Sequence, residues 1–290
     1  MDNFLQNTNT LKNWMLATPA IDSLSLCELT LPGTHNAGCD WKASWPFFGP
    51  PAHWVACQHE SFYSQLCHGS RALDIRLLQD DSAKGLDKFG MHHNGSRNSR
   101  TLRNLVTDVE QFLKESPNEF IILDFHQLQG EGFDFTNFNN LVKQYLGHRI
   151  IPTKNLSLSL HQLKQISAAQ RIIVAAPWHI ALDRTVFHEQ IRHKWSGSGI
   201  TNAADLKQHI INVLKYPPGT GAPWSLSATS YSALGGPVDI HDELNSWFDP
   251  NNSDWASKCN IINVDFIEES NIVSYCRTVN LMKARDRVPR

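Results

Sequence analysis

The stretch LTLPGTHNAG, residues 29–38, joins the end of an apolar run to a Pro-Gly pair and then to a histidine. We expect residues 26–31 to form a buried strand that stops at Pro32 and Gly33, because proline lacks the N–H that strand pairing uses. The turn needs Pro32 and Gly33, but it has no need of His35. His35 is therefore either an ordinary loop residue or one member of a reactive group, and the other strand ends decide between these readings.

Further apolar or β-branched runs follow, and segments with helical spacing lie between several of them. The runs that predict strands are residues 71–78, 88–92, 119–125, 171–176, 224–230 and 260–267. Residues 101–116, 138–147 and 270–284 have the apolar spacing of helices. Strands that alternate with helices indicate a mostly parallel sheet covered by helices. We predict a single α/β domain over residues 1–290, a distorted TIM-type (β/α) barrel with its core at about 25–285.

The composition excludes some classes of function. The net charge of the 290 residues is −2, so the chain lacks the basic face that nucleic-acid binding requires. No run approaches the roughly 20 apolar residues that cross a bilayer. Residues 1–14 lack the basic and apolar regions of a signal peptide, which predicts a cytoplasmic chain or the mature form of a secreted one. The six cysteines have no C-x-x-C spacing, so zinc is not expected, and both disulfides and buried free thiols stay open.

Polar residues with catalytic potential follow five of the predicted strands, and in a parallel barrel such ends form one face. They are His35 and Asn36, Asp74 and Arg76, His92 and His93, Asp124 and His126, and Asp265. Asp74 and Arg76 are two residues apart and share a side of their strand, where a structural ion pair is the alternative to a catalytic role. Asp265 interrupts an apolar run, and a buried carboxylate needs a partner such as a histidine.

Two histidines and an arginine suit transfer at a phosphodiester. One imidazole removes the proton of the attacking hydroxyl, the other protonates the leaving oxygen, and the guanidinium binds the phosphate oxygens. The sequence has no G-x-S-x-G elbow, no Gly-rich phosphate loop and no H-E-x-x-H.

These residues lie in segments that resemble the phosphatidylinositol-specific phospholipase C family, the X-domain superfamily, and its metal-independent bacterial branch in particular. The matching segments are LPGTHNAG (31–38), RALDIRLL (71–78), MHHNG (91–95), NEFIILDF (118–125) and NIINVDFIEE (260–269). They occur in the family's order over roughly residues 25–280. The resemblance implies a distorted TIM-type barrel in which the inositol 2-hydroxyl attacks phosphorus. The products are then diacylglycerol and inositol 1,2-cyclic phosphate.

The resemblance also implies roles for individual residues. His35 matches the general base, and Asp265 matches the carboxylate that orients it. Arg76 matches the arginine that binds phosphate, with Asp74 as the acidic residue beside it. His93, rather than the histidine before it, matches the general acid.

Cofactors and headgroup contacts follow from the same comparison. Metal-dependent relatives have a calcium-binding acid at the Arg76 position, so no cofactor is expected, and calcium at Asn36 and Asp74 is the alternative. Bacterial relatives have aspartate at the Asn36 position, where it supports the acid histidine, so Asp74 or Asp124 would take over that role here. We expect substrate contacts at Asn36, Asp124, His126 and Tyr231, and we find no inositol-binding arginine after the strand at 171–176.

Aromatic side chains predict contact with a membrane surface. The loop at 41–54 carries Trp45, Phe47 and Phe48, and a second pair is Trp247 and Phe248. Relatives insert such side chains into the lipid interface, and the alternative is a small core beneath a long loop. The resemblance implies a monomer that acts on a phospholipid as a peripheral protein, secreted by analogy. A catalytically weak barrel that binds inositol phosphates or lipid headgroups is the alternative function. A glycerophosphodiester phosphodiesterase would need paired metal-binding glutamates near the first strand, which the sequence lacks.

Overall fold

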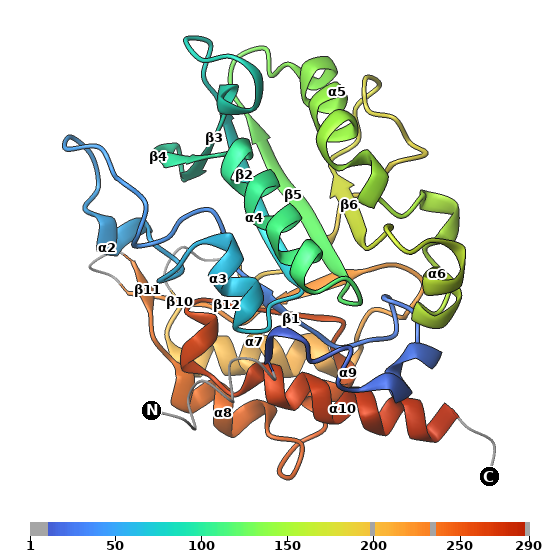
Figure 1. The fold of residues 1–290 in the computed structure, drawn as a ribbon. Coiled ribbons are helices and arrows are strands. Elements are labelled where there is room, and N and C mark those ends of the chain that lie inside the picture. Colours follow the sequence, from blue (N-terminus) through green and yellow to red (C-terminus); the bar gives the residue numbers. More distant parts are fainter. Residues whose placement is uncertain (1–10, 198–200, 233–235, 288–290) are drawn as a thin grey trace.

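Strands in the order β7-β6-β5-β2-β1-β12-β9-β8, all paired in parallel, form a curled sheet in the computed structural model, which describes residues 11–197, 201–232 and 236–287 (Figure 1). Their bounds are β1 Leu31–Thr34, β2 Ala72–Gln79, β5 Ile121–Gln129, β6 Ile172–Ala176, β7 Phe187–Glu189, β8 Arg192–Lys194, β9 Trp224–Ser227 and β12 Ile261–Val264. A hairpin of β3 (Phe89–His93) and β4 (Ser96–Thr101) extends β2 in the antiparallel sense. The strands β10 (Ser230–Tyr231) and β11 (Pro237–Val238) form a separate small sheet.

The segment from β7 to β8 brings the two edges of the sheet together. Only Gln190 and Ile191 separate these strands, and the first pairs with β6 while the second pairs with β9. One extended stretch of chain therefore serves both edges, and the sheet curls into a distorted TIM-type barrel of a single α/β domain. The fold class predicted from the sequence is confirmed.

Helices lie around the outside of this sheet (Figure 1). Figure 1 shows α4 and α5 against the part that contains β2 and β5, with α7, α8 and α10 against another part. The α-helices are α2 Ala52–Val55, α3 Phe62–Cys67, α4 Leu102–Glu115, α5 Phe135–Leu146, α6 Leu160–Ile166, α7 Ala203–Lys215, α8 His241–Phe248, α9 Trp255–Lys258 and α10 Ile272–Arg287. Short 3-10 helices lie at Pro19–Ser23, Gly85–Lys88, Gly147–Arg149, Thr153–Asn155 and Ile267–Glu269.

Alternation along β2 decides which side chains face the inside of the barrel. Leu73, Ile75 and Leu77 are fully buried in the cluster that contains the apolar face of α4. Because successive strand residues point to opposite faces, Asp74 and Arg76 point to the inner side.

The first strand differs from its prediction. Residues 26–30 precede it, and β1 contains the Pro-Gly pair that we expected to end it. Pro32 costs no ladder bond to β2, because that pairing begins only at Gly33 opposite Ala72. A side chain at Gly33 would come within 2.7 Å of Ile261 on β12, so close strand packing explains this glycine.

Candidate active site

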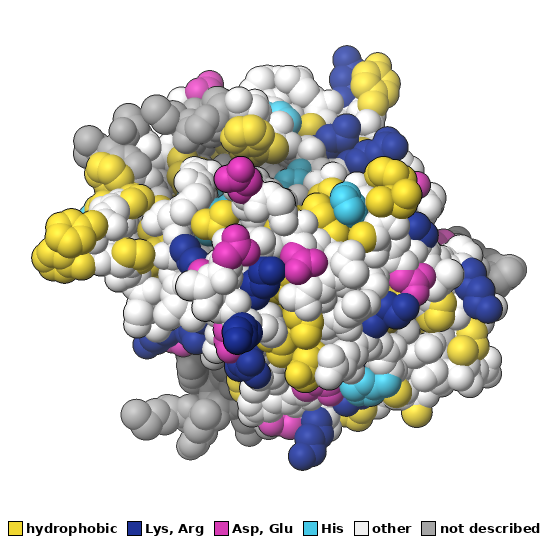
Figure 2. All heavy atoms as spheres, turned by 90° about the horizontal axis from the view of Figure 1, so that it is seen from above, with side chains coloured by type: hydrophobic (Ala, Val, Ile, Leu, Met, Phe, Trp, Pro, Cys, Tyr) yellow, Lys and Arg dark blue, Asp and Glu magenta, His cyan; other side chains and the backbone are white. Residues whose placement is uncertain are grey.

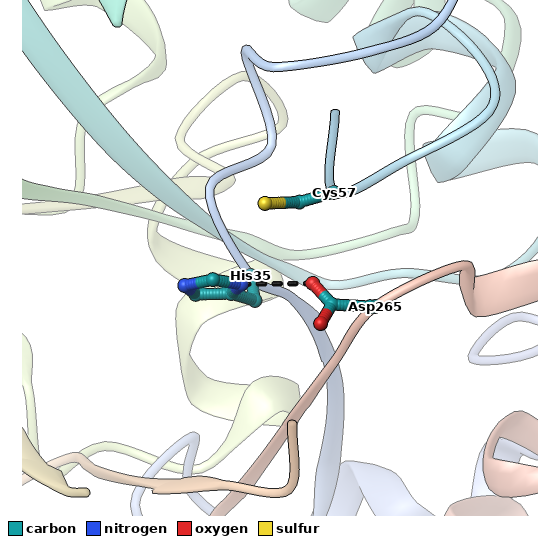
Figure 3. A group of neighbouring side chains, drawn as sticks. All are labelled: His35, Cys57 and Asp265. Carbon is teal, nitrogen blue, oxygen red and sulfur yellow. Dashed lines mark hydrogen bonds and ion pairs between the residues drawn. The ribbon is translucent and has the colours of Figure 1, made fainter. Parts of the chain in front are cut away.

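His35 directly follows β1, and Asp265 directly follows the adjacent strand β12. The His35 N–H donates to the Val264 carbonyl at 2.9 Å, and Gln58 Nε2 donates to the carbonyls of both His35 and Val264. This backbone arrangement places His35 Nδ1 2.8 Å from Asp265 Oδ1. Figure 3 shows the two side chains facing each other. The carboxylate accepts, so Nδ1 carries the proton and Nε2 keeps a free lone pair. Burial raises the pKa of Asp265, against the opposing attraction of His35.

Cys57 and Tyr231 lie beside this pair (Figure 3 shows Cys57). Tyr231 Oη is 3.3 Å from Cys57 Sγ and 3.5 Å from His35 Nδ1. Burial raises the pKa of Cys57 well above its usual value, and Asp265 adds to this effect, so the thiol keeps its proton and is no nucleophile. The Tyr231 ring meets the His35 imidazole edge-on, with centroids 6.0 Å apart. A platform role for Tyr231 beneath a sugar ring stays a prediction.

Arg76 reaches the cavity while it is paired with Asp74. Its Nη2 and Nε atoms donate to the Asp74 carboxylate at 3.0 and 3.3 Å. Burial of Asp74 opposes ionisation, but the Arg76 charge outweighs it and holds the Asp74 pKa well below its usual range. The ion pair that we considered as an alternative is therefore present. It leaves other N–H groups of the guanidinium for an anion, because arginine has five donors in total.

His93 reaches the cavity from a direction that the sequence analysis did not anticipate. We treated residues 88–92 as a barrel strand, but β3 is antiparallel to β2 and lies off the parallel path. His93 Nδ1 donates to the Val55 carbonyl at 3.0 Å, and its ring centroid is 6.3 Å from that of His35. Burial lowers the pKa of His93 to about 3, with repulsion from His35 and Arg76 adding to the shift. The free protein thus holds His93 neutral.

No carboxylate contacts His93 among the described residues, so the expected replacement by Asp74 or Asp124 is wrong. Asp74 pairs with Arg76, and Asp124 pairs with another histidine. The neighbouring His92 is fully buried and accepts the Gly95 N–H, which keeps it out of the cavity.

Asn36 is fully buried at the turn after β1 and is not among the residues that line the cavity. Its φ of 42° is left-handed, a conformation that asparagine tolerates better than most residues. Its N–H points to Asp74 Oδ2 at 3.3 Å, while its side-chain amide has no hydrogen-bond partner. The expected contact of Asn36 with substrate would require a rearrangement of this turn.

A second histidine–aspartate pair lies in the same cavity. His193 on β8 lies 2.6 Å from Asp124 on β5 (Nε2 to Oδ2), and the His126 ring stacks on the His193 ring at 3.7 Å. His126 is two residues after Asp124 on β5 and therefore points to the same inner side. The pairing of β2 with β5 shifts by one residue at His126, and Gln127 lines the cavity as well. The sequence analysis found Asp124 and His126 but missed His193, because the three-residue β8 is too short for a periodic signal.

These side chains line one cavity of about 590 Å³. Its lining includes the predicted residues His35, Arg76, His93, His126 and Tyr231. It also includes residues that the sequence analysis missed, namely Asn94, Gln127, Gln190, Ile191, Arg192, His193, Trp195, Ser227 and Thr229. The extended segment through β7 and β8 supplies several of these, including Arg192.

Exposed aromatic side chains lie partly where we predicted them. Phe47 and Phe48 are 93% and 89% exposed, whereas Trp45 is half-buried and donates its Nε1–H to the Asp40 carbonyl. The prediction for Trp247 and Phe248 is wrong. Both belong to α8 and lie in the hydrophobic core, because their spacing with Leu244 forms one apolar helical face.

Other apolar side chains are exposed instead. Trp178 and Ile180, in the segment after β6, are 74% and 84% exposed, and Trp195 after β8 is exposed at the cavity. Figure 2, which views the molecule from above, shows hydrophobic side chains that project at the edges of this face and histidines nearer its centre.

Two expectations about the whole chain can be compared with the structure. No helix in the described residues has the length and hydropathy needed to cross a membrane. The signal-peptide expectation concerns mainly residues 1–10, which lie outside the described residues. All six cysteines are free thiols, five of them buried and Cys67 half-buried. Of the two states that stayed open, the structure has the reduced one.

The fold and this cavity define an α/β barrel protein whose polar site lies at the carboxyl ends of the strands. No protein-family model matches the chain. The chain is 32% identical over 134 residues to a 1-phosphatidylinositol phosphodiesterase of Listeria monocytogenes, a match over 45% of this chain and 38% of that protein. It is 30% identical over 207 residues to a variant-surface-glycoprotein phospholipase C of Trypanosoma cruzi, over 63% of this chain and 50% of that protein. The chain thus spans half or less of the length of these two relatives.

Solved structures show the same fold. The phosphatidylinositol-specific phospholipase C of Listeria monocytogenes superposes with a TM-score of 0.69 at 19% identity, over 93% of this chain and 98% of that one. A variant of the Staphylococcus aureus phosphatidylinositol-specific phospholipase C gives a TM-score of 0.64 at 14% identity, over 93% and 99%. The resemblance to phosphatidylinositol-specific phospholipase C proteins, and to their bacterial type in particular, is confirmed.

Proposed function

We propose that this chain is a phospholipase C-type phosphodiesterase that cleaves phosphatidylinositol to diacylglycerol and inositol 1,2-cyclic phosphate. The observation that carries the proposal is His35, paired with Asp265, in one cavity with His93 and Arg76. The Listeria monocytogenes relative is named for phosphatidylinositol, and the Trypanosoma cruzi relative is named as a phospholipase C.

In the proposed first step, His35 acts as general base. Its Nε2 takes the proton of the inositol 2-hydroxyl, and Asp265 stabilises the imidazolium that forms. The hydroxyl oxygen then attacks phosphorus, while N–H groups of Arg76 that Asp74 does not use bind the phosphate oxygens.

His93 is the proposed general acid, and it must gain a proton at Nε2 before it can act. In the free protein its Nδ1 proton is held by the Val55 carbonyl, and burial keeps the ring neutral. A bound phosphodiester anion supplies a negative charge that offsets the repulsion from His35 and Arg76, which favours the imidazolium. His93 then protonates the diacylglycerol oxygen as the bond to phosphorus breaks.

This mechanism uses no metal. The Arg76 guanidinium forms an ion pair with the carboxylate of Asp74. Asp74 is one of the two residues of the alternative calcium site. A calcium ion there would have to displace an ion pair and would find few of the six to eight oxygen ligands it prefers.

Membrane contact is proposed through Phe47 and Phe48 together with Trp178, Ile180 and Trp195. Such apolar side chains partition into the lipid interface, and Trp195 joins this surface to the cavity. We propose a monomer that binds the bilayer peripherally while the headgroup enters the cavity.

Turnover of phosphatidylinositol in detergent mixed micelles tests the proposal. We expect the wild type to release diacylglycerol, and His35→Ala and His93→Ala each to lose most activity while circular dichroism stays unchanged. His161→Ala is a matched control, because His161 is exposed on α6 and lies outside the cavity lining. Near-normal turnover in a folded His35→Ala or His93→Ala would refute the role of that histidine, and an inactive wild type that still binds inositol phosphate would favour the binding barrel.

A further inference from the structure

Three groups of side chains among the described residues have the composition and closeness of a metal site. The first, His35 with Cys57 and Asp265, belongs to the proposed catalytic pair, and its thiol keeps its proton. The second, His59 with Glu268 and Glu269, is partly exposed, and His59 already pairs with both carboxylates. The third consists of Asp124, His126 and His193. Its two histidines line the cavity, and the proposed mechanism gives this group no step.

The three potential ligand atoms of this third group all lie within 4.8 Å of one another. His193 Nε2 and His126 Nδ1 face the same Asp124 oxygen, at 2.6 and 3.9 Å. The stacked rings, 3.7 Å apart and inclined by 12°, come from different strands and still present a nitrogen on the same side. A small tilt of one ring lets both nitrogens converge on one ion.

Two polar atoms of this group have no hydrogen-bond partner although they are buried. They are Asp124 Oδ1 and His126 Nδ1. Leaving such atoms unsatisfied is unfavourable, and native proteins normally pair them with protein groups, water or an ion.

We propose that Asp124, His126 and His193 bind a divalent transition metal ion of the zinc type. Two imidazoles and one carboxylate are ligands that Zn²⁺ accepts, whereas Ca²⁺ requires more oxygen ligands. Binding replaces the hydrogen bond between His193 and Asp124 by two metal–ligand bonds. His193 gives up its Nε2 proton and binds as a neutral imidazole that carries a proton on Nδ1. Three protein ligands leave a fourth position open, and two of them, His126 and His193, line the cavity.

Metal binding to the full chain without lipid tests this site directly, so its outcome is independent of whether the protein cleaves phosphatidylinositol. Chelator-treated protein is dialysed against about 10 µM Zn²⁺, and the bound metal is measured by mass spectrometry. We expect one Zn²⁺ per chain in the wild type and at least a tenfold weaker affinity in Asp124→Asn and His193→Gln. His126→Gln is the safer variant, because it removes a ligand whose Nδ1 has no hydrogen bond to lose.

Two controls separate this group from other metal-binding residues. Cys57→Ser removes a member of the competing group, and His161→Gln removes an exposed histidine on α6. Both should bind Zn²⁺ as the wild type does. The absorption spectrum of the protein loaded with Co²⁺ in place of Zn²⁺ should have visible bands. It should have no sulfur-to-metal charge-transfer band, because no cysteine is a ligand. A wild type that binds no Zn²⁺, a folded His126→Gln with unchanged affinity, or loss of binding in Cys57→Ser would each overturn the proposal.

Discussion

Replacing Asp265 with asparagine removes the charge behind His35 and keeps the shape of the side chain. At an effective dielectric constant of about 20, unit charges separated by the observed 2.8 Å attract each other by about 6 kcal/mol. This energy corresponds to about four decades in rate and is an upper limit, because the amide oxygen still accepts a hydrogen bond. The amide can also donate to His35 Nδ1, which would move the ring proton to Nε2 and abolish the base. We therefore expect kcat to fall by about 10²- to 10⁴-fold.

The assay is diacylglycerol release from phosphatidylinositol in mixed micelles, with kcat and KM determined separately. Asp265 is not among the residues that line the cavity, so KM should change little. Asp22→Asn is a matched control, because Asp22 is also an ion-paired aspartate but binds Lys164 away from the site. Circular dichroism should be unchanged in both variants.

A folded Asp265→Asn protein with more than about a tenth of wild-type kcat would refute the reasoning, because the pair could then contribute little more than 1 kcal/mol to catalysis. A large rise in KM with unchanged kcat would also contradict it, since that result would assign Asp265 to substrate binding.

Arg76→Lys keeps the positive charge but loses the planar guanidinium that binds two phosphate oxygens at once. We expect kcat/KM for phosphatidylinositol to fall by about 10²-fold, and added calcium should not restore it. Full activity in this variant would contradict the proposed phosphate contact. Burial lowers the pKa of His92 to about 4, so its neutral form stabilises the fold above pH 6.5 and this contribution is lost as the pH falls. Urea unfolding measures this effect. Between pH 7 and pH 5, the free energy of unfolding should fall by about 2 kcal/mol less in His92→Gln than in the wild type, and an equal fall in both proteins would exclude the effect. Phe47→Ser with Phe48→Ser should weaken vesicle binding by more than about tenfold and leave turnover of a soluble substrate unchanged, whereas unchanged vesicle binding would refute the interface. Trp247→Ala should instead lower the free energy of unfolding by about 3–5 kcal/mol, because this side chain is only 8% exposed, and an unfolding free energy near that of the wild type would contradict its core position.

The sequence predicted the barrel because buried parallel strands are continuous apolar runs. Residues 71–78 and 119–125 match β2 and most of β5, and residues 101–116 match α4. The first strand was misplaced, because Pro32 pairs with β12 and costs no ladder bond to β2, whose pairing begins only at Gly33. The hairpin of β3 and β4 could not be recognised as antiparallel from its own residues.

The candidate site was predicted where a polar residue interrupts or ends an apolar run. His35, Arg76 and Asp265 satisfy this condition, and the structure brings them together. His193 comes from a three-residue strand without an apolar run, so only the tertiary structure reveals its contact with Asp124.

Trp247 was wrongly predicted to lie at the membrane surface. A Trp-Phe pair in a polar segment looked like an exposed loop, yet helical spacing with Leu244 directs both aromatic rings into the core. A helical-period test of residues 241–248 would have corrected this interpretation.

Phosphorus NMR of the products formed from phosphatidylinositol vesicles, with and without EDTA, tests the central claim most directly. The proposed attack of the inositol 2-hydroxyl, with Arg76 in place of a metal, predicts that the inositol 1,2-cyclic phosphate resonance appears first and at the same rate under both conditions. The absence of any cyclic inositol phosphate would contradict the claim that this chain is a phospholipase C of this type, and complete loss of the product with EDTA would contradict the metal-free mechanism.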